Sequence, residues 1–417
     1  MDQMKRLASF AVLLTAAILF LSVAYGLAAG LGGTTTWNAA PEPTGGTIDY
    51  VTDTLTHQVQ TPFPTQPALG GTWHDTVLGG TVRRVSSDHT ASENYTCNCW
   101  INADNTMYLN TADKTVRSTT TGATLYSETG SWGSPSYDIG WSPIDPNIYY
   151  YWGSDASLRQ RNVVTATTTI VHTFPSTLQS LGGSVNFVDA TDNYFAVEYG
   201  NQTYIYSRSD NLVFTGSSSR SVGTGWAGIT PSAKHLIVDS SHLKYSYPID
   251  KVAHTVGAET LFWTMDGDHN AFTTLSNGND YLLSFDDSTP TMYRVDVTLP
   301  QTAGNTAQQK AQNYLVFPNA GWMDSHQSCV MVGSHIDWCF VATATALVNN
   351  LPYWNELFAI NMLTGEIRRY AHSLSDITSS DSYYYYPRIS VSPVAIRREK
   401  SDRAAWATRK PAPTTSM

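Results

Sequence analysis

A short pattern of residues returns at nearly regular intervals along this chain of 417 residues. Each copy has a short apolar run, a turn of Asp, Asn, Ser, Pro or Gly, and a second aromatic or β-branched run. The five clearest copies span residues 100–108, 141–149, 187–195, 229–237 and 274–282. Their first residues are 41, 46, 42 and 45 positions apart, which is the period of a four-stranded propeller blade. The spacing therefore predicts an all-β fold made of consecutive blades.

Seven such units account for the body of the chain. They begin near Tyr95, Tyr137, Ser184, Trp226, His269, His326 and Arg388. The last unit lacks an outer strand, and residues 81–85 form a strand-like run that precedes the first unit. Placing this run in the last blade closes the ring and leaves no long open sheet edge. The sequence predicts a seven-bladed β-propeller, closed by an N-terminal strand, over residues 76–410.

The segments that flank this body differ in composition. Lys5 and Arg6 precede an apolar run, which is typical of a secretory signal peptide over residues 1–28. An uncleaved membrane anchor is the alternative, because the apolar stretch 7–29 covers 23 residues. Residues 29–75 are rich in Thr, Pro and Gly and predict a linker, and residues 411–417 predict a tail. We expect a secreted, periplasmic or cell-envelope protein.

The net charge of the chain limits the kinds of molecule that it is expected to bind. The chain has 24 Lys and Arg against 34 Asp and Glu, a formal net charge of −10, with no basic run. Such a surface repels phosphate backbones, which argues against nucleic acid. We expect a monomer whose partner is a glycan or an extracellular protein, and which meets a membrane only through an uncleaved N-terminal anchor.

Four cysteines in an exported chain indicate disulfides. Cys329 and Cys339 flank two short runs around a Gly-Ser-His turn and would face one another in a hairpin, so we predict that they are bridged. Cys97 and Cys99 lie on one face of a strand, where a mutual bridge would close a small strained ring. Metal binding by this pair is the alternative, and its pairing stays open.

Residues that open successive units are expected to converge, because each innermost propeller strand starts near one mouth of the central channel. We predict that the ligand-binding residues at this mouth are Tyr137, Asp138, Asn186, Trp226, Trp322 and Tyr384. The tyrosine run 383–386 has the character of a platform for sugar rings, since aromatic faces bind the apolar faces of pyranoses. The alternative is that these residues hydrogen-bond between blades or form an ordinary loop.

Histidines and carboxylates in the same positions predict a metal site. The candidate ligands are Asp266, Asp268, His269 and His326. Segment 266–277 matches a calcium-binding loop at its first, third and fifth positions, but Ala271 and Asn277 depart from that pattern. A divalent ion such as Ca or Mn is therefore one expectation, and a plain Asp-Gly turn with no cofactor is the other.

Three stretches of the chain resemble exported bacterial β-propellers of the TolB-like kind and, more distantly, propellers of the oligogalacturonate lyase type. They are residues 141–151 (W-S-P-I-D-P-N-I-Y-Y-Y), residues 80–85 (G-T-V-R-R-V), and G-E-I-R-R-Y-A-H-S (365–373) followed by Y-P-R-I-S-V-S-P (386–393). The resemblance covers about residues 76–409 and implies a propeller. Related propellers include enzymes, binders and scaffolds, so it is only weakly specific for activity.

The lyase relatives imply a metal-assisted polysaccharide lyase that acts on uronate-containing glycans. The residues that would serve such catalysis here are His269, His326, Tyr386 and Arg388. The chain departs from the lyase pattern, because the His326-Gln327 pair has no second histidine two or three residues on. Three functions stay open: non-catalytic binding of an extended ligand, lyase activity, and a structural role in the cell envelope.

Overall fold

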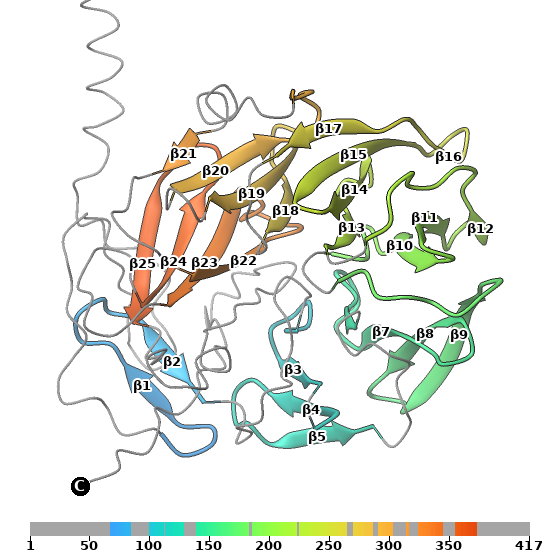
Figure 1. Ribbon diagram of the computed structural model, residues 1–417. Helices are drawn as coiled ribbons and strands as arrows, with labels where there is room; N and C mark the ends of the chain where they lie inside the picture. Colours follow the sequence, from blue (N-terminus) through green and yellow to red (C-terminus); the bar gives the residue numbers. More distant parts are fainter. Residues whose placement is uncertain are drawn as a thin grey trace, which may run out of the picture.

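The computed structural model describes residues 67–84, 100–111, 113–128, 139–182, 186–222, 225–264, 270–286, 291–302, 314–316, 324–344 and 355–372. Within these ranges the chain forms strands and turns and no helix. Antiparallel strands make an N-terminal hairpin and six larger sheets, which follow one another in chain order around a ring (Figure 1). The all-β prediction is confirmed. The predicted signal peptide, Cys97, Cys99 and the tail lie outside the described residues.

The six sheets are numbered here in chain order. Sheet 1 holds β3 (Met107–Asn110), β4 (Thr115–Ser118) and β5 (Thr124–Ser127), and sheet 2 holds β6 (Gly140–Trp141), β7 (Ile148–Trp152), β8 (Ser157–Asn162) and β9 (Thr167–Thr173). Sheet 3 holds β10 (Tyr194–Tyr199), β11 (Gln202–Ser207) and β12 (Leu212–Val213). Sheet 4 holds β13 (Ala227–Ile229), β14 (His235–Ser240), β15 (Leu243–Asp250), β16 (Thr255–Val256) and β17 (Thr260–Trp263). Sheet 5 holds β18 (Ala271–Thr274), β19 (Asp280–Asp286), β20 (Thr291–Asp296) and β21 (Tyr314–Val316), and sheet 6 holds β22 (Asp324–Cys329), β23 (Trp338–Ala344), β24 (Glu356–Asn361) and β25 (Ile367–His372).

Every clear copy of the repeated pattern is the first hairpin of a sheet. The facing residues are Ile101 and Tyr108, Trp141 and Tyr149, Val188 and Phe195, Ile229 and Leu236, and Thr274 and Asp280. The polar residues of the pattern shape the turn: Asn102 Oδ1 accepts the backbone N–H of Thr106 and Met107, and Asp189 Oδ1 accepts those of Asn193 and Tyr194. Short polar side chains favour turns for this reason.

Hydrogen bonds at the level of these turns also join each sheet to the next. We call this series of contacts the turn belt. Its bonds are Asn102 Nδ2 to Pro146 O (2.9 Å), Tyr150 Oη to Asp192 Oδ2 (2.8 Å), Ala190 N to Pro231 O (2.9 Å), Ser232 N to Thr274 Oγ1 (2.9 Å) and Ser276 N to Asp337 Oδ1 (2.7 Å). The repeat therefore both turns the chain and links sheets 1 to 6 in order.

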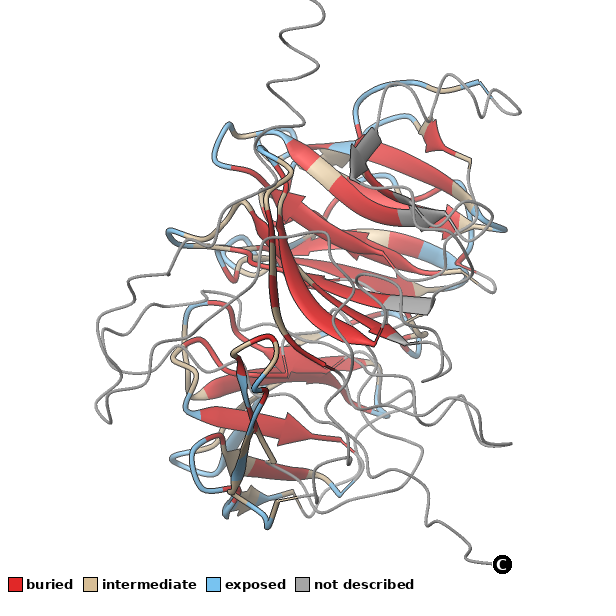
Figure 2. Ribbon diagram, turned by 90° about the vertical axis from the view of Figure 1, so that its left-hand side faces the viewer, coloured by how far each residue is buried: buried red, intermediate tan, exposed pale blue. Residues whose placement is uncertain are grey.

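Apolar and aromatic side chains fill the spaces between consecutive sheets. Tyr150 of sheet 2 meets Phe195 of sheet 3 edge-on, with ring centroids 5.0 Å apart, and Trp226, next to sheet 4, meets Phe272 of sheet 5 at 5.3 Å. Figure 2 shows that the strands are buried along most of their length, while exposed residues gather in the turns and at outer strands. Because both faces of a sheet are covered, β7 is aliphatic or aromatic and buried at all five positions.

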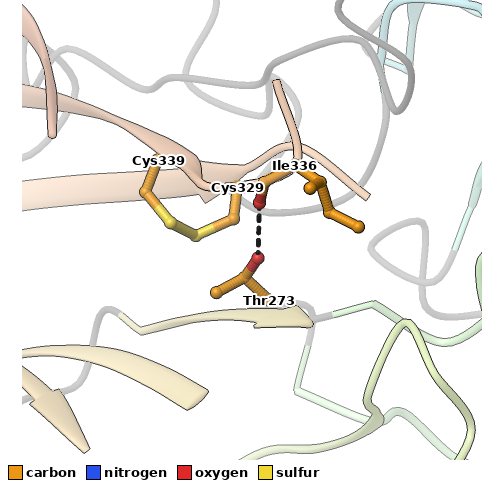
Figure 3. The surroundings of a disulfide bond; sticks show 4 residues. All are labelled: Thr273, Cys329, Ile336 and Cys339. Carbon is orange, nitrogen blue, oxygen red and sulfur yellow. Dashed lines mark hydrogen bonds between the residues drawn. A yellow bond between two sulfur atoms is a disulfide. The ribbon is translucent and has the colours of Figure 1, made fainter. Parts of the chain in front are cut away.

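Cys329 and Cys339 form a disulfide that joins β22 to β23, as predicted. The two residues face one another in the register of the strands, with Cα atoms 4.0 Å apart. Beside the bridge, Thr273 Oγ1 of sheet 5 donates to Ile336 O in the turn of sheet 6, at 3.2 Å (Figure 3). The bridge thus closes the hairpin whose turn contacts sheet 5.

The N-terminal hairpin, β1 (Thr72–His74) and β2 (Thr81–Arg83), packs on sheet 6. Val82 lies in one apolar cluster with Ala342, Leu357 and Ala371 of that sheet. On its other side, Arg83 Nη1 donates to Thr120 O in the β4–β5 turn of sheet 1. The hairpin therefore contacts both ends of the series of sheets. The predicted linker boundary at residue 75 falls inside this hairpin, so the described fold begins before residue 76.

Buried charged groups fasten the hairpin to sheet 6. Asp75 Oδ2 accepts hydrogen bonds from the backbone N–H and from Nδ1 of His372, both at 2.7 Å. Burial alone would raise the pKa of Asp75, but the bonds from His372 and the turn outweigh it and hold the pKa below its ordinary value. Nearby, Arg369 and Glu356 form a fully buried two-point ion pair.

We expect Asp280→Asn to weaken the turn belt. The buried Asp280 carboxylate accepts from Ser232 Oγ, Thr274 Oγ1 and His235 Nδ1 at 2.6–2.8 Å, and an amide loses one acceptor oxygen. The free energy of unfolding at pH 7 should fall by about 1–3 kcal/mol, measured by urea denaturation. The matched control is Asp250→Asn, an exposed position where a single oxygen accepts two turn N–H groups; an equal loss in the control would contradict the expectation.

The same carboxylate gives a pH dependence. Burial would raise the pKa of Asp280, but hydrogen bonds from His235, Thr274, Thr230 and Ser232 hold it below the ordinary value of 3.8. Its stabilisation is therefore complete above about pH 3.8 and is lost as the pH falls through the lower folded-state pKa. The difference in unfolding free energy between wild type and Asp280→Asn should shrink over that acidic range.

Candidate functional site

The turn belt defines two faces of the ring. The turn face carries the repeated turns. The mouth face is the opposite end of the sheets, where each first strand begins and where the turn between the second and third strands lies. In sheets 1 and 3 the first strand is the short segment at Ile101 or Val188, so β3 and β10 count as second strands. Because first strands run toward the turn face, the predicted mouth residues Asn186, Trp226 and His326 all lie toward the mouth face.

All three of these predicted residues are buried between elements of the fold. Asn186, Trp226 and His326 are 8%, 3% and 3% exposed. Asn186 O accepts from Ile229 N at 2.9 Å, which joins sheets 3 and 4. His326 faces Ala342 in the register of β22 and β23. Asn186 thus lies between sheets 3 and 4, Trp226 lies against Phe272 of sheet 5, and His326 belongs to sheet 6.

The other predicted site residues lie outside the described residues. Among the ligand-binding candidates these are Tyr137, Asp138, Trp322 and Tyr384, among the catalytic candidates His269, Tyr386 and Arg388, and among the metal ligands Asp266, Asp268 and His269. Within the described ranges, no group of three or more His, Cys, Asp or Glu is placed to hold a metal ion. The same ranges contain no apolar helix long enough to span a membrane.

A buried ion pair beside Trp226 was not predicted from the sequence. Lys244 Nζ lies 3.2 Å from Asp239 Oδ2, with the two side chains 0% and 2% exposed. The residues face one another across β14 and β15, and Asp239 N donates to Trp226 O at 2.7 Å. Opposite charges on either side of the short turn between two apolar runs are the signal that would have located this pair.

The mouth face of sheet 2 carries a closed polar triad. Ser157 Oγ donates to Asp155 Oδ1, while Arg159 donates from Nε to Ser157 Oγ and from Nη2 to Asp155 Oδ2, at 2.5–2.9 Å. The hydrogen bonds from Ser157 and Arg159 lower the pKa of Asp155. A side chain at Gly153 would collide with all three residues, so the triad needs glycine there.

Sheet 1 repeats this triad at the same turn. Asp113, Thr115 and Arg117 make the same set of bonds. Both copies follow the pattern Asp-x-Ser/Thr-x-Arg, which the sequence displays but which we did not single out. These bonds stay within one sheet.

The mouth face of sheet 3 carries a group that we call the Tyr shelf: Tyr199, Tyr204, Gln179, Asn201 and Gln202. The rings of Tyr199 and Tyr204 stack in parallel, with centroids 4.2 Å apart and an interplanar angle of 7°. Both are partly exposed, and Asn201 and Gln202 are exposed in the turn between β10 and β11. The sequence predicted an aromatic platform at 383–386 and missed this one, whose signal is a tyrosine on each side of a Gly-Asn turn.

Comparison with known proteins finds similar folds. No protein-family model matches the chain, and no curated protein matches its sequence. An oligogalacturonate lyase from Vibrio parahaemolyticus is similar at 10% identity with a TM-score of 0.46, and an oligogalacturonate lyase in complex with manganese at 13% and 0.49; each comparison covers 78% of this chain and 90% of the other. TolB from Acinetobacter baumannii is similar at 16% and 0.35, covering 66% and 62%. These neighbours include both kinds of propeller that the sequence resembles, at identities that say nothing of activity.

We expect Lys244→Met to be strongly destabilising, because it leaves the Asp239 carboxylate buried without its cation. Removing one partner of a buried pair costs about 3–5 kcal/mol, whereas replacing both partners by apolar groups is close to neutral. Urea denaturation of Lys244→Met and of the double variant with Asp239→Leu measures both effects. Arg159→Met, which breaks the exposed pair with Asp155, is the control and should cost less than about 1 kcal/mol. A single-variant loss no larger than the control would contradict the expectation.

Proposed function

We propose that this protein is an exported, seven-bladed β-propeller that binds an extended ligand, a glycan or an extracellular protein, on its mouth face. The observation that carries the proposal is the difference between the two faces. On the turn face, polar groups of the repeat are used in bonds from sheet to sheet. On the mouth face, the Asp113–Arg117 and Asp155–Arg159 pairs at the second turns of sheets 1 and 2 bond within their own sheet and stay partly exposed.

The groups on the mouth face suit an extended ligand. The triads of sheets 1 and 2 present arginines and carboxylates, and the Tyr shelf of sheet 3 presents rings and amides. These three sheets are consecutive in the ring. A ligand that crosses from one to the next would meet charged, polar and aromatic groups in turn, as recognition of a glycan or peptide requires.

Export is supported by the disulfide. Cys329 and Cys339 are bridged in sheet 6, and structural disulfides persist mainly in oxidising compartments. The N-terminal pattern of Lys5 and Arg6 before an apolar run agrees with this. A secreted, periplasmic or cell-envelope location is therefore part of the proposal.

Lyase action on uronate polymers is the alternative. It requires a divalent ion at Asp266, Asp268, His269 and His326, and the only one of these that is described, His326, is 3% exposed. A buried imidazole reaches a polymer only if sheet 6 opens at that point. A structural envelope module is the third function, and it requires no ligand. We favour binding because the two polar triads and the Tyr shelf are partly exposed on the mouth face of sheets 1 to 3, where a ligand can reach them.

Closure of the ring by the N-terminal strand can be tested through hydrogen exchange. If residues 81–85 share the last blade with the unit that begins near Arg388, Ile389→Pro removes a ladder hydrogen bond. Amides of 81–85 should then exchange faster, with no change in sheet 3, as measured by mass spectrometry. Thr414→Pro in the predicted tail is the control. Unchanged exchange at 81–85 would refute the closure.

Binding can be tested by the footprint of a ligand on the two faces. Soluble neutral glycans and oligogalacturonate are added to the full chain, and amide exchange is compared with and without each. We expect a binding ligand to slow exchange at 153–157 and 199–203 on the mouth face, and to leave 230–234 and 275–279 on the turn face unchanged. Protection confined to the turn face, or none with any ligand, contradicts the proposal.

The same samples test the alternative. If a chelator abolishes binding and unsaturated uronate products absorb in the ultraviolet before its addition, the lyase function replaces simple binding. Absence of such products leaves non-catalytic binding as the function that the footprint supports.

A further inference from the structure

The Tyr shelf on sheet 3 combines a flat aromatic pair with a fixed set of amides. Tyr199 ends β10 and Tyr204 lies in β11, so the short turn between them brings both rings to the mouth end of one sheet. The ring centroid of Tyr199 also lies 5.8 Å from that of Phe174. Among the described aromatic rings, only Tyr199 stacks on Tyr204. Within the described ranges no second aromatic ring lies against Tyr204, whose partly exposed ring also packs on the apolar core cluster of sheets 2 to 4.

The amides around this pair are held by bonds that consume their oxygens. Gln179 Oε1 accepts from Asn201 N at 2.7 Å, and Asn201 Oδ1 accepts from Gln179 Nε2 at 2.9 Å. Gln202 Oε1 accepts from Tyr204 Oη at 2.9 Å. All three acceptors are satisfied within the shelf. Among the described residues, Asn201 Nδ2 and Gln202 Nε2 donate to no partner, so these N–H groups can donate to another molecule.

Ionic groups take no part in this arrangement. The five members of the shelf are neutral, and the neighbouring Glu198 is 4% exposed and alternates to the opposite face of β10 from Tyr199. The chain as a whole carries a formal charge of −10. A polyanion would therefore find a repulsive surface and no cation within the shelf, whereas an uncharged ligand bears no such cost.

We propose that the Tyr shelf is a subsite for a pyranose ring of a neutral glycan. The apolar face of the ring stacks on Tyr204, and the hydroxyl oxygens accept hydrogen bonds from the Asn201 and Gln202 amides. This inference rests on the proposed function and adds the class of ligand and the place of one sugar ring. Because the amides are already bonded to Gln179 and Tyr204, little side-chain freedom is lost on binding.

The experiment is isothermal titration of the full chain at pH 7 with β-1,4-linked hexaoses of glucose, mannose and xylose, and with hexagalacturonate for comparison. We expect one neutral hexaose to bind and Tyr204→Ala to weaken it at least tenfold, on the order of 1.4 kcal/mol. Tyr204→Phe keeps the ring and should stay within about threefold of wild type. Gln202→Ala should weaken binding without altering the melting temperature, which keeps the test valid if Tyr204→Ala unfolds.

Tyr126→Ala supplies the control, since Tyr126 of sheet 1 is also partly exposed and lies outside the shelf. Binding of hexagalacturonate alone, or equal affinity of wild type, Tyr204→Ala and Gln202→Ala for a neutral hexaose, overturns the subsite. In that case a footprint elsewhere on the mouth face still upholds the proposed function. If no glycan and no protein ligand protects the mouth face, both fail.

Discussion

The hydrogen bonds of the turn belt are the constraint on which the rest of this fold depends. A four-stranded sheet of this kind cannot bury both faces alone, so each sheet is stable only against its neighbours. Apolar packing supplies most of the attraction between neighbouring sheets, but it is non-directional and does not fix their relative orientation. Bonds such as Ser232 N to Thr274 Oγ1 and Ser276 N to Asp337 Oδ1 set how far each sheet is rotated and shifted against the next.

Because the turn belt lies on the turn face, it constrains the residues of that face more than those of the mouth face. Residues such as Asn102 and Asp280 shape or flank a turn and also contact a neighbouring sheet, so most substitutions there affect two structures at once. In sheets 1 and 2, the triads at the turn between the second and third strands bond within their own sheet and have no such double role. Sheets 1 and 2 keep a Gly-supported triad or its equivalent at that place, whereas sheet 3 has Gly200 and Asn201, and sheet 4 a buried Lys244. Variation between sheets is concentrated where a ligand would be met.

Local pattern was sufficient to predict the hairpins and the disulfide. Both depend on contacts between residues close in sequence, where the period and the turn residues set the register, as for Cys329 and Cys339. The site was harder. Of the residues that open first strands and were expected at the channel mouth, the three that are described, Asn186, Trp226 and His326, are buried, and Asn186 O bonds to Ile229 of the next sheet. Tyr199 and Tyr204 were missed because the sequence alone does not show that their rings share one face of a sheet.

The junction of the N-terminal hairpin with sheet 6 shows how a contact between distant segments is made specific. Successive sheets find one another because a short connection keeps them together, but Asp75 and His372 are 297 residues apart. The apolar cluster at this junction is small, with Val82 packed among Ala342, Leu357 and Ala371. Buried charges are costly unless every bond is made, so the two bonds from His372 penalise any other docking of the hairpin. The junction that lacks a short covalent connection thus adds buried charged bonds to its apolar packing.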